Sequence, residues 1–254
     1  GIHVFDSEVL GDTIIWSGNT SGYAIYVRRS KVSNNDINCD GSNRDWLIHS
    51  THNNANQRSE ISNNVLYLGR IQGAIYGDYL DIHNNYLNGS ANQGNSHDEW
   101  GIHPEGYCNI TNNQIIGFRD GIYADGDWSN EITDNYFEVR RYGVYANNTH
   151  GDHVVSNNVF KRYGSDWNDY WLIYFTNAAS VTLQNNHFEA TVGKGAYFNN
   201  TSVTMDHNLI VSPGRGLELT NQSGGTIMNN TMISTGNGDY GITVSNLSTP
   251  IIRN

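Results

Sequence analysis

The sequence predicts an all-β protein folded as a right-handed parallel β-helix, a solenoid of about ten to eleven coils with roughly 23 residues in each. Three observations predict this fold. An apolar-x-Asn-Asn element recurs along the chain, a small-aliphatic-polar element recurs between its copies, and helical periodicity is lacking. We therefore expect a single β-helix domain over residues 1–254.

The first repeated element places an apolar residue two positions before a pair that is usually Asn-Asn. Asn tolerates the left-handed backbone of a sharp corner, and its amide can hydrogen-bond to the next coil. We therefore predict that these pairs support the coils and carry no chemistry. The nine copies occur at intervals of 21 to 29 residues and begin at Val32, Ile61, Ile82, Ile110, Ile132, Val155, Leu183, Met205 and Ile227.

The second repeated element, typified by Gly121-Ile122-Tyr123, predicts two outward columns of side chains. Its aliphatic residues should point inward and stack at intervals of ~4.8 Å, and alternate residues should face outward. The first outward column contains His3, Tyr26, His49, Tyr76, His103, Tyr123, Tyr145, Tyr174, Tyr197, Glu218 and Thr243. The second lies two residues further on and contains Phe5, Arg28, Thr51, Asp78, Glu105, Asp125, Asn147, Thr176, Asn199, Thr220 and Ser245.

Both columns have two interpretations. The aromatic residues either stack to stabilise a sheet or line a groove that binds sugar rings. The acids Asp78, Glu105 and Asp125 either are simply solvated or serve a function. Stacking three carboxylates on consecutive coils costs stability through repulsion, which favours a function, either catalysis or binding of an ion such as Ca²⁺.

The catalytic candidates are Glu105, Asp125, Asp78 and His103. Glu105 is the candidate general acid, and Asp125 or Asp78 is the candidate base or nucleophile. Carboxylates on neighbouring coils should lie ~5 Å apart, as in retaining glycosidases, and those two coils apart ~9.6 Å, as in inverting ones. The candidate substrate-binding residues are Tyr76, Tyr123, Tyr145, His49, Trp100 and Arg141. Another polar cluster, residues 149–153, is predicted to be a solvated corner.

Composition excludes several classes of function. Acids outnumber bases by 11, and the lysines are only Lys31, Lys161 and Lys194, which argues against nucleic acid as a partner. No apolar run approaches the ~20 residues of a membrane span. Cys39 and Cys108 cannot form a disulfide framework, and whether they pair stays open.

One local resemblance points to a family. Residues 100–105 (WGIHPE), 120–125 (DGIYAD) and 141–143 (RYG) resemble the active-site coils of the mannuronan C5-epimerases and their alginate-lyase relatives. Those enzymes are right-handed parallel β-helices with an aromatic-Gly-aromatic-Asp-Pro-His motif, an aspartate one coil later and an Arg-His-Gly further on. The resemblance covers about 50 residues, from 99 to 152, and implies a groove at the same place on the helix.

The match to that family is partial. Pro104, Asp125 and Arg141 stand where the motif requires them. The departures are Trp100 for tyrosine, His103 for aspartate, Glu105 for histidine and Tyr142 for the second histidine. Enzymes acting on uronate chains must also neutralise substrate carboxylates, whereas this groove has three acids and few lysines. It fits a neutral or cationic glycan better, or a Ca²⁺-assisted mechanism.

The sequence therefore predicts a secreted polysaccharide-acting enzyme, a glycoside hydrolase or a lyase or epimerase-like protein. The alternative is a non-catalytic structural or adhesive β-helix from a surface fibre or tailspike-like assembly, and its assembly as a homotrimer or as a fibre stays open. A carbohydrate-binding module differs from the enzyme only in lacking turnover. Nine Asn-x-Ser/Thr sequons are candidate N-glycan sites, and a glycan on Asn147 or Asn199 would block the groove.

Two features concern the limits of the domain. Gly1 begins inside one repeated element and Asn254 stops inside the other, so we expect the chain to be an excerpt of a longer protein. Three longer coils carry polar or aromatic insertions, residues 38–45, 88–99 and 163–170. Such excursions usually wall the binding face of a solenoid.

Overall fold

The computed structural model describes residues 1–17, 22–39, 46–51, 53–69, 71–89, 99–126, 129–164, 169–236 and 240–253. Within these ranges the chain forms 32 strands and no helix. It follows that the described part of the chain holds no helix that could cross a membrane. The predicted loop residues 40–45, 90–98 and 165–168 lie outside the described residues.

The strands form three parallel sheets, named here A, B and C. Sheet A contains β1 (Ile2–Phe5), β4 (Ile25–Arg28), β7 (Trp46–Ser50), β10 (Gly73–Gly77), β13 (Trp100–Pro104), β16 (Asp120–Asp125), β19 (Tyr142–Asn147), β22 (Trp171–Thr176), β25 (Lys194–Asn199), β28 (Leu217–Thr220) and β31 (Ile242–Val244). Sheet B contains β2 (Glu8–Leu10), β5 (Lys31–Ser33), β8 (Ser59–Ser62), β11 (Leu80–His83), β14 (Cys108–Thr111), β17 (Asn130–Thr133), β20 (Asp152–Ser156), β23 (Ser180–Gln184), β26 (Ser202–Asp206), β29 (Gly224–Met228) and β32 (Thr249–Arg253). Sheet C contains β3 (Thr13–Trp16), β6 (Asp36–Cys39), β9 (Val65–Leu68), β12 (Tyr86–Asn88), β15 (Gln114–Ile116), β18 (Tyr136–Val139), β21 (Val159–Arg162), β24 (His187–Ala190), β27 (Leu209–Ser212) and β30 (Thr231–Ser234).

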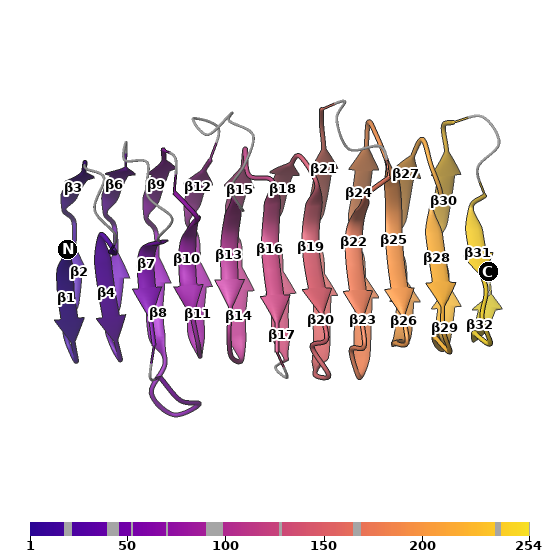
Figure 1. Cartoon of the computed structure of the whole chain (residues 1–254), viewed down its shortest axis with the longest axis horizontal. Coiled ribbons are helices and arrows are strands. Elements are labelled where there is room, and N and C mark those ends of the chain that lie inside the picture. The colour runs from indigo at the N-terminus through magenta and orange to yellow at the C-terminus, as the bar shows by residue number, and fades with distance from the viewer. Residues whose placement is uncertain are drawn as a thin grey trace.

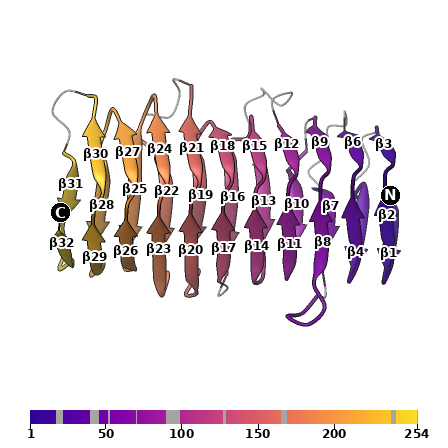
Figure 2. The same ribbon diagram turned by 180° about the vertical axis from the view of Figure 1, so that it is seen from behind.

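Each coil contributes one strand to each sheet, so consecutive coils stack along a single axis (Figure 1). Sheets A and B have eleven strands each and sheet C has ten. The predicted β-solenoid and its number of coils are therefore confirmed. The first and last strands lie at opposite ends of the row, as the view from behind also shows (Figure 2).

The core is built from like residues stacked on like. The inward aliphatics of sheet A, such as Ile75 and Ile102, pair in register and are fully buried. Sheet C contributes a stack of phenylalanines, in which Phe137 and Phe160 have ring centroids 4.5 Å apart. A Cβ on Gly121 would lie 2.6 Å from the Phe137 ring. The small residue at this position of β16 is therefore needed to admit the phenylalanine from sheet C. Both cysteines are buried as thiols.

The two asparagines of each Asn-Asn pair have different roles. The first adopts the left-handed conformation, as Asn112 does at φ 53°, and its side chain is exposed. The second points inward and joins a buried amide ladder. Asn135, for example, accepts hydrogen bonds from the backbone N–H and the amide of Asn113 at 2.9 and 3.0 Å. It donates to the Asn158 amide oxygen at 3.0 Å and the Ile110 carbonyl at 2.8 Å. The prediction that the pairs support the corners is confirmed.

Replacing Asn135 with Leu should lower the free energy of unfolding by about 3 kcal/mol or more, since at least two buried polar groups lose their partner at about 1–3 kcal/mol each. Urea denaturation measures the effect. The matched control is Asn112→Gly, which keeps the left-handed turn and alters only an exposed amide, and it should change stability by about 0.5 kcal/mol or less. Equal destabilisation by the two variants would contradict a supporting role for the inner ladder.

Candidate functional site

The strand register confirms the two outward columns on sheet A. Tyr76 pairs with His49 on one side and with His103 on the other, and Tyr123 pairs with Tyr145. In the second column Asp125 pairs with Asn147, and the Glu105 backbone N–H donates to the Gly77 carbonyl. The predicted acids therefore do lie on consecutive coils of one face.

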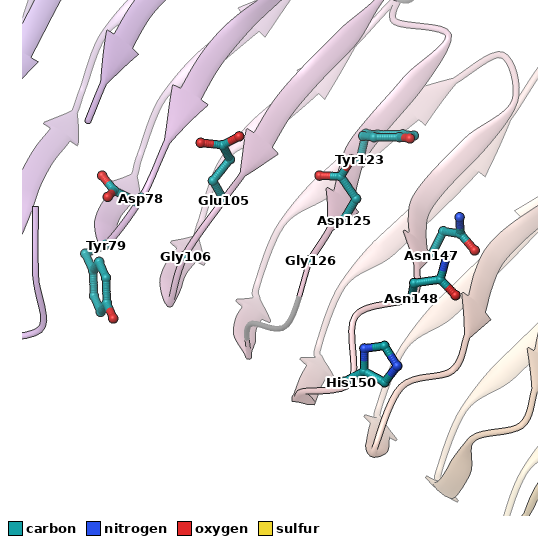
Figure 3. Close-up of a pocket in the computed structure, with 10 residues that line it drawn as sticks. All are labelled: Asp78, Tyr79, Glu105, Gly106, Tyr123, Asp125, Gly126, Asn147, Asn148 and His150. Carbon is teal, nitrogen blue, oxygen red and sulfur yellow. The ribbon is translucent and has the colours of Figure 1, made fainter. Parts of the chain in front are cut away.

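The three acids line one cleft of about 820 Å³ where the strands of sheet A end (Figure 3). Of the predicted residues, Asp78, Glu105, Asp125 and Tyr123 line it. Their side chains come from successive coils. The other lining residues, which were not among the predicted site residues, are Tyr79, Gly106, Gly126, Asn147, Asn148 and His150.

A hydrogen bond between His103 and Asp125 organises the centre of the cleft. The His103 Nε2 lies 2.8 Å from the Asp125 Oδ1, and since a carboxylate can only accept, Nε2 carries the proton. This hydrogen bond, which outweighs partial burial, lowers the pKa of Asp125 below its ordinary value. Asp125 is half exposed and can meet a substrate.

His103 itself is enclosed. The side chain is only 10% exposed and its Nδ1 is buried. Aromatic rings surround it at centroid distances of 5.1 to 5.6 Å, those of Trp46, Tyr76, Trp100 and Tyr123. This geometry supports a role in positioning Asp125 rather than in contacting a substrate.

A second pair lies one coil away. The side chains of Tyr76 and Glu105 share a hydrogen bond, which the phenol donates to the carboxylate. Burial and this bond to Glu105 raise the pKa of Tyr76 well above its usual range. Tyr76 therefore remains a phenol that holds the Glu105 carboxyl group.

The tyrosines of the column stack on one another. Tyr123 lies between Trp100 and Tyr145, with centroids 4.4 and 5.1 Å away and interplanar angles of 14° and 10°. Tyr145 continues the stack to Tyr174 at 5.0 Å. The ring faces are therefore covered, and only edges and hydroxyl groups are available. This supports the stabilising interpretation of Tyr123 and Tyr145 more than stacking on sugar rings.

A third column, not recognised in the sequence, begins each coil of sheet A. Trp46, Gly73, Trp100, Asp120 and Tyr142 follow one another in register. The indoles of Trp46 and Trp100 have centroids 5.7 Å apart across Gly73. A Cβ on Gly73 would lie 2.2 Å from the Trp46 ring. The sequence signal was the residue that precedes each small residue of the second repeated element.

The remaining predicted residues do not line the cleft. Arg141 forms an ion pair with the fully buried Asp120, with its Nε 2.8 Å from Oδ1. Its guanidinium also lies 4.8 Å from the Tyr142 ring centroid. His49 packs against the rings of Tyr23 and Tyr76 at 4.0 and 4.7 Å. Trp100 and Tyr145 belong to the aromatic stacks described above.

The described residues of the cleft contain no preformed set of metal ligands. Among the described residues no three His, Cys, Asp or Glu side chains converge as a metal site. The suggestion of Ca²⁺ at the acidic cluster therefore gains no geometric support.

The polar corner after β19 is only partly solvated. His150 and Asp152 are exposed, and His150 lines the cleft. His153 points inward, is only 2% exposed and packs against Phe175 with centroids 5.2 Å apart. The prediction of a solvated corner is wrong for Thr149, which is 1% exposed. It is also wrong for His153, because the inward alternation of β20 (burial of His153 and Val155) places it in the core.

Residues 74–233 match the model of a family described as right handed beta helix region. The chain belongs to this right-handed β-helix family. The match covers the strands of all three sheets that carry the cleft and confirms the predicted hand. The resemblance to mannuronan C5-epimerases is a separate matter and stays a prediction.

Other comparisons give little further detail. No curated protein matches this β-helix. Among solved structures, a tailspike protein entitled "Crystal structure of Dettilon tailspike protein (gp208)" is 12% identical, with a TM-score of 0.42. The alignment covers 96% of this chain and 62% of that chain.

The His103 hydrogen bond can be tested on Asp125 directly. We expect the pKa of Asp125, measured by carbon NMR, to rise toward its ordinary value of ~3.9 in His103→Phe. His103→Gln retains an N–H donor and should keep much of the lowering. Since the folded-state pKa is lowered, the pair stabilises the fold fully above pH ~4, and this contribution is lost as the pH falls through the folded-state pKa. An unchanged pKa in His103→Phe would show that another group holds the carboxylate.

Burial lowers the pKa of His153 to about 4. The neutral ring therefore stabilises the fold fully above its unfolded pKa of ~6.5, and this stability, on the order of 3 kcal/mol, is lost as the pH falls toward about 4. We expect His153→Phe to flatten the decline in unfolding free energy between pH 6.5 and 4. Parallel pH profiles for wild type and variant would contradict this.

Proposed function

We propose that this β-helix binds a polysaccharide in the cleft and hydrolyses it with Glu105 and Asp125. One observation carries the proposal. Two carboxylates on neighbouring coils line the same cleft, and each is held by a hydrogen bond from a partly or largely buried aromatic residue, Tyr76 or His103. Glycoside hydrolysis requires such a pair, one group to donate a proton and the other to act while ionised.

We assign the two carboxylates different roles. Asp125 has a lowered pKa and is ionised, which suits a nucleophile or base. Glu105 is then the acid that protonates the leaving glycosidic oxygen. Adjacent coils are spaced ~4.8 Å apart, close to the separation of a retaining pair. In that mechanism Asp125 attacks the anomeric carbon, and water, deprotonated by Glu105, releases the sugar.

Asp78 provides a second arrangement. It lies two coils from Asp125, a spacing of ~9.6 Å that leaves room for a water molecule between the two carboxylates, as in inverting enzymes. In that case Glu105 lies between the two and binds the substrate. The anomeric configuration of the first product distinguishes the two arrangements.

The stacked tyrosines support a second candidate function. A column whose ring faces are covered stabilises a long solenoid, as expected of a structural or adhesive β-helix of a surface fibre or tailspike-like assembly. Both candidates place the protein outside the cell and take a polysaccharide as partner. They differ in turnover.

Substitutions of the carboxylates test the catalytic proposal. Wild type, Glu105→Gln and Asp125→Asn are incubated with a panel of neutral, cationic and uronic polysaccharides, while reducing ends and the absorbance of unsaturated products are followed. We expect reducing ends without unsaturation, and a rate that falls by about 10²–10⁴ in each variant. The control Glu131→Gln alters an exposed carboxylate of β17 on sheet B and should keep the full rate.

Two outcomes would overturn the hydrolase. Unsaturated products would indicate a lyase. An absence of turnover across the panel, with and without Ca²⁺, would leave binding or structure as the function.

A further inference from the structure

The turn that follows each strand of sheet A changes its chemistry along the axis. In the first coils it carries Asp6 and Arg29, and beside the acids Asp78, Glu105 and Asp125 it carries Tyr79, Gly106 and Gly126. From β19 onward every turn carries an asparagine: Asn148, Asn177, Asn200, Asn221 and Asn246. The strand residues that precede these are all uncharged and polar: Asn147, Thr176, Asn199, Thr220 and Ser245. We name the five turn asparagines, together with Asn147 and Asn199, the amide track.

The turn itself does not require asparagine. Asn177 and Asn200 adopt the left-handed conformation at φ 53° and 51°. Asp6, Arg29 and Tyr79 adopt the same conformation at φ 49°, 49° and 48° in equivalent turns. Since the turn accepts an acid, a base and an aromatic residue, the unbroken run of amides needs another explanation.

The amides are held in fixed orientations by one another. The Asn177 amide donates to the Asn148 amide oxygen at 2.5 Å, and the Asn200 amide donates to Asn177 at 2.9 Å. The Asn221 amide donates to Asn199 at 3.0 Å. Each amide has two N–H donors and two lone pairs, so these bonds leave donors and acceptors for a ligand on an oriented surface.

The track continues the acidic cleft. Asn147 and Asn148 line that cleft, and the Asn148–Asn177 bond links it to a second cleft of about 570 Å³. The second cleft is lined by Asn177, Asn199, Asn200, Asn221, Gln222, Asn246 and Leu247. Among the described residues that line the two clefts, none is Lys or Arg.

We propose that the amide track binds the hydroxyl groups of a neutral polysaccharide, whose chain runs along the solenoid axis from the acidic cleft. The inference rests on the proposed function and names its substrate class. Paired donors and acceptors match sugar hydroxyls, which donate and accept. Uronate chains are disfavoured, because the three acids repel them and no cation among the lining residues compensates. Four coil steps of ~4.8 Å extend the track over ~19 Å, enough for several sugar residues.

Two sequons within the track have a structural origin. Thr201 and Ser223, the hydroxyl residues of the sequons at Asn199 and Asn221, are buried in the turn. Their hydroxyls donate to the carbonyls of Asn199 and Thr220 at 3.0 and 2.7 Å. The Asn-x-Ser/Thr pattern there follows from the turn, and a host without Asn glycosylation yields the unmodified track for the test.

Glycine substitutions test the track without disturbing its backbone, because glycine adopts the left-handed conformation freely. The triple variant Asn177→Gly, Asn200→Gly and Asn221→Gly is compared with the control triple Asn63→Gly, Asn84→Gly and Asn112→Gly. The control residues are exposed and, like the three track residues, left-handed, at φ 55°, 58° and 53°, but they lie in the turns between sheets B and C. Both triples are made with Glu105→Gln, and binding of soluble glucan, galactan, mannan, alginate and polygalacturonate is measured by affinity electrophoresis.

We expect the protein to bind a neutral polymer. Its affinity should fall at least about tenfold in the track variant, because several hydrogen bonds are lost, and should be unchanged in the control variant. Equal binding by the two triples would overturn the track, and preference for alginate or polygalacturonate would overturn the neutral substrate. Absence of binding to every polymer would overturn both the binding role of the amide track and the neutral substrate class.

Turnover separates this inference from the proposed function. Suppose that wild type cleaves a neutral polymer and that the track triple variant, with Glu105 intact, cleaves it with the same KM. That result supports the proposed hydrolase and contradicts binding by the amide track. If the track triple variant loses binding and wild type shows no turnover, the result supports binding by the amide track and contradicts the proposed hydrolase.

Discussion

The structure depends on backbone hydrogen bonds between consecutive coils in parallel register. These bonds place each residue directly over its counterpart in the next coil, at a spacing of ~4.8 Å. The same side chains therefore meet repeatedly, which is favourable for the inner amides and for the Phe137–Phe160 stack. The outer Tyr123–Tyr145 stack follows from the same constraint. A solenoid of this kind is stabilised by neighbour contacts that repeat along its whole length.

In the acidic cleft the parallel register of the coils is unfavourable. Asp78, Glu105 and Asp125 come from consecutive coils, and parallel register brings like charges together. The surrounding structure offsets part of the cost, since His103 and Tyr76 each hold one carboxylate with a hydrogen bond. The aromatic rings around His103 in turn keep it in place. The proposed function rests on this pair of carboxylates, each held by a residue from a neighbouring coil.

The side-chain chemistry of the outer surface of sheet A changes progressively along the solenoid axis. Its second column and the turn beside it pass from mixed residues, such as Phe5, Asp6 and Arg28, through the acids to the amide track. The turns at Asp6, Arg29 and Tyr79 share the left-handed conformation of the turn asparagines, so the change between them lies in the side chains. The proposed function and the proposed substrate class both derive from this change, the acids for bond cleavage and the amides for hydroxyl recognition.

Much of this arrangement is determined by the sequence alone, because a coil repeats its pattern at every turn. The spacing of the Gly-Ile-Tyr and Ile-Thr-Asn-Asn elements was sufficient to predict the solenoid, its coils, the corner role of asparagine and the register that aligns Asp78, Glu105 and Asp125. Period-2 alternation then identified which side chains face outward. The catalytic roles stay predictions.

Only the tertiary structure decided which residues these side chains contact and in which orientation. Trp46 and Trp100 meet across Gly73 because glycine has no side chain to separate the two rings, and no local pattern reveals which ring fills the space of a glycine. The covered faces of Tyr123, the enclosure of His103 and the pairing of Arg141 with Asp120 arise in the same way. Sequence periodicity determines which residues share a column, whereas ring orientation, burial and hydrogen-bond direction depend on contacts among three coils at once.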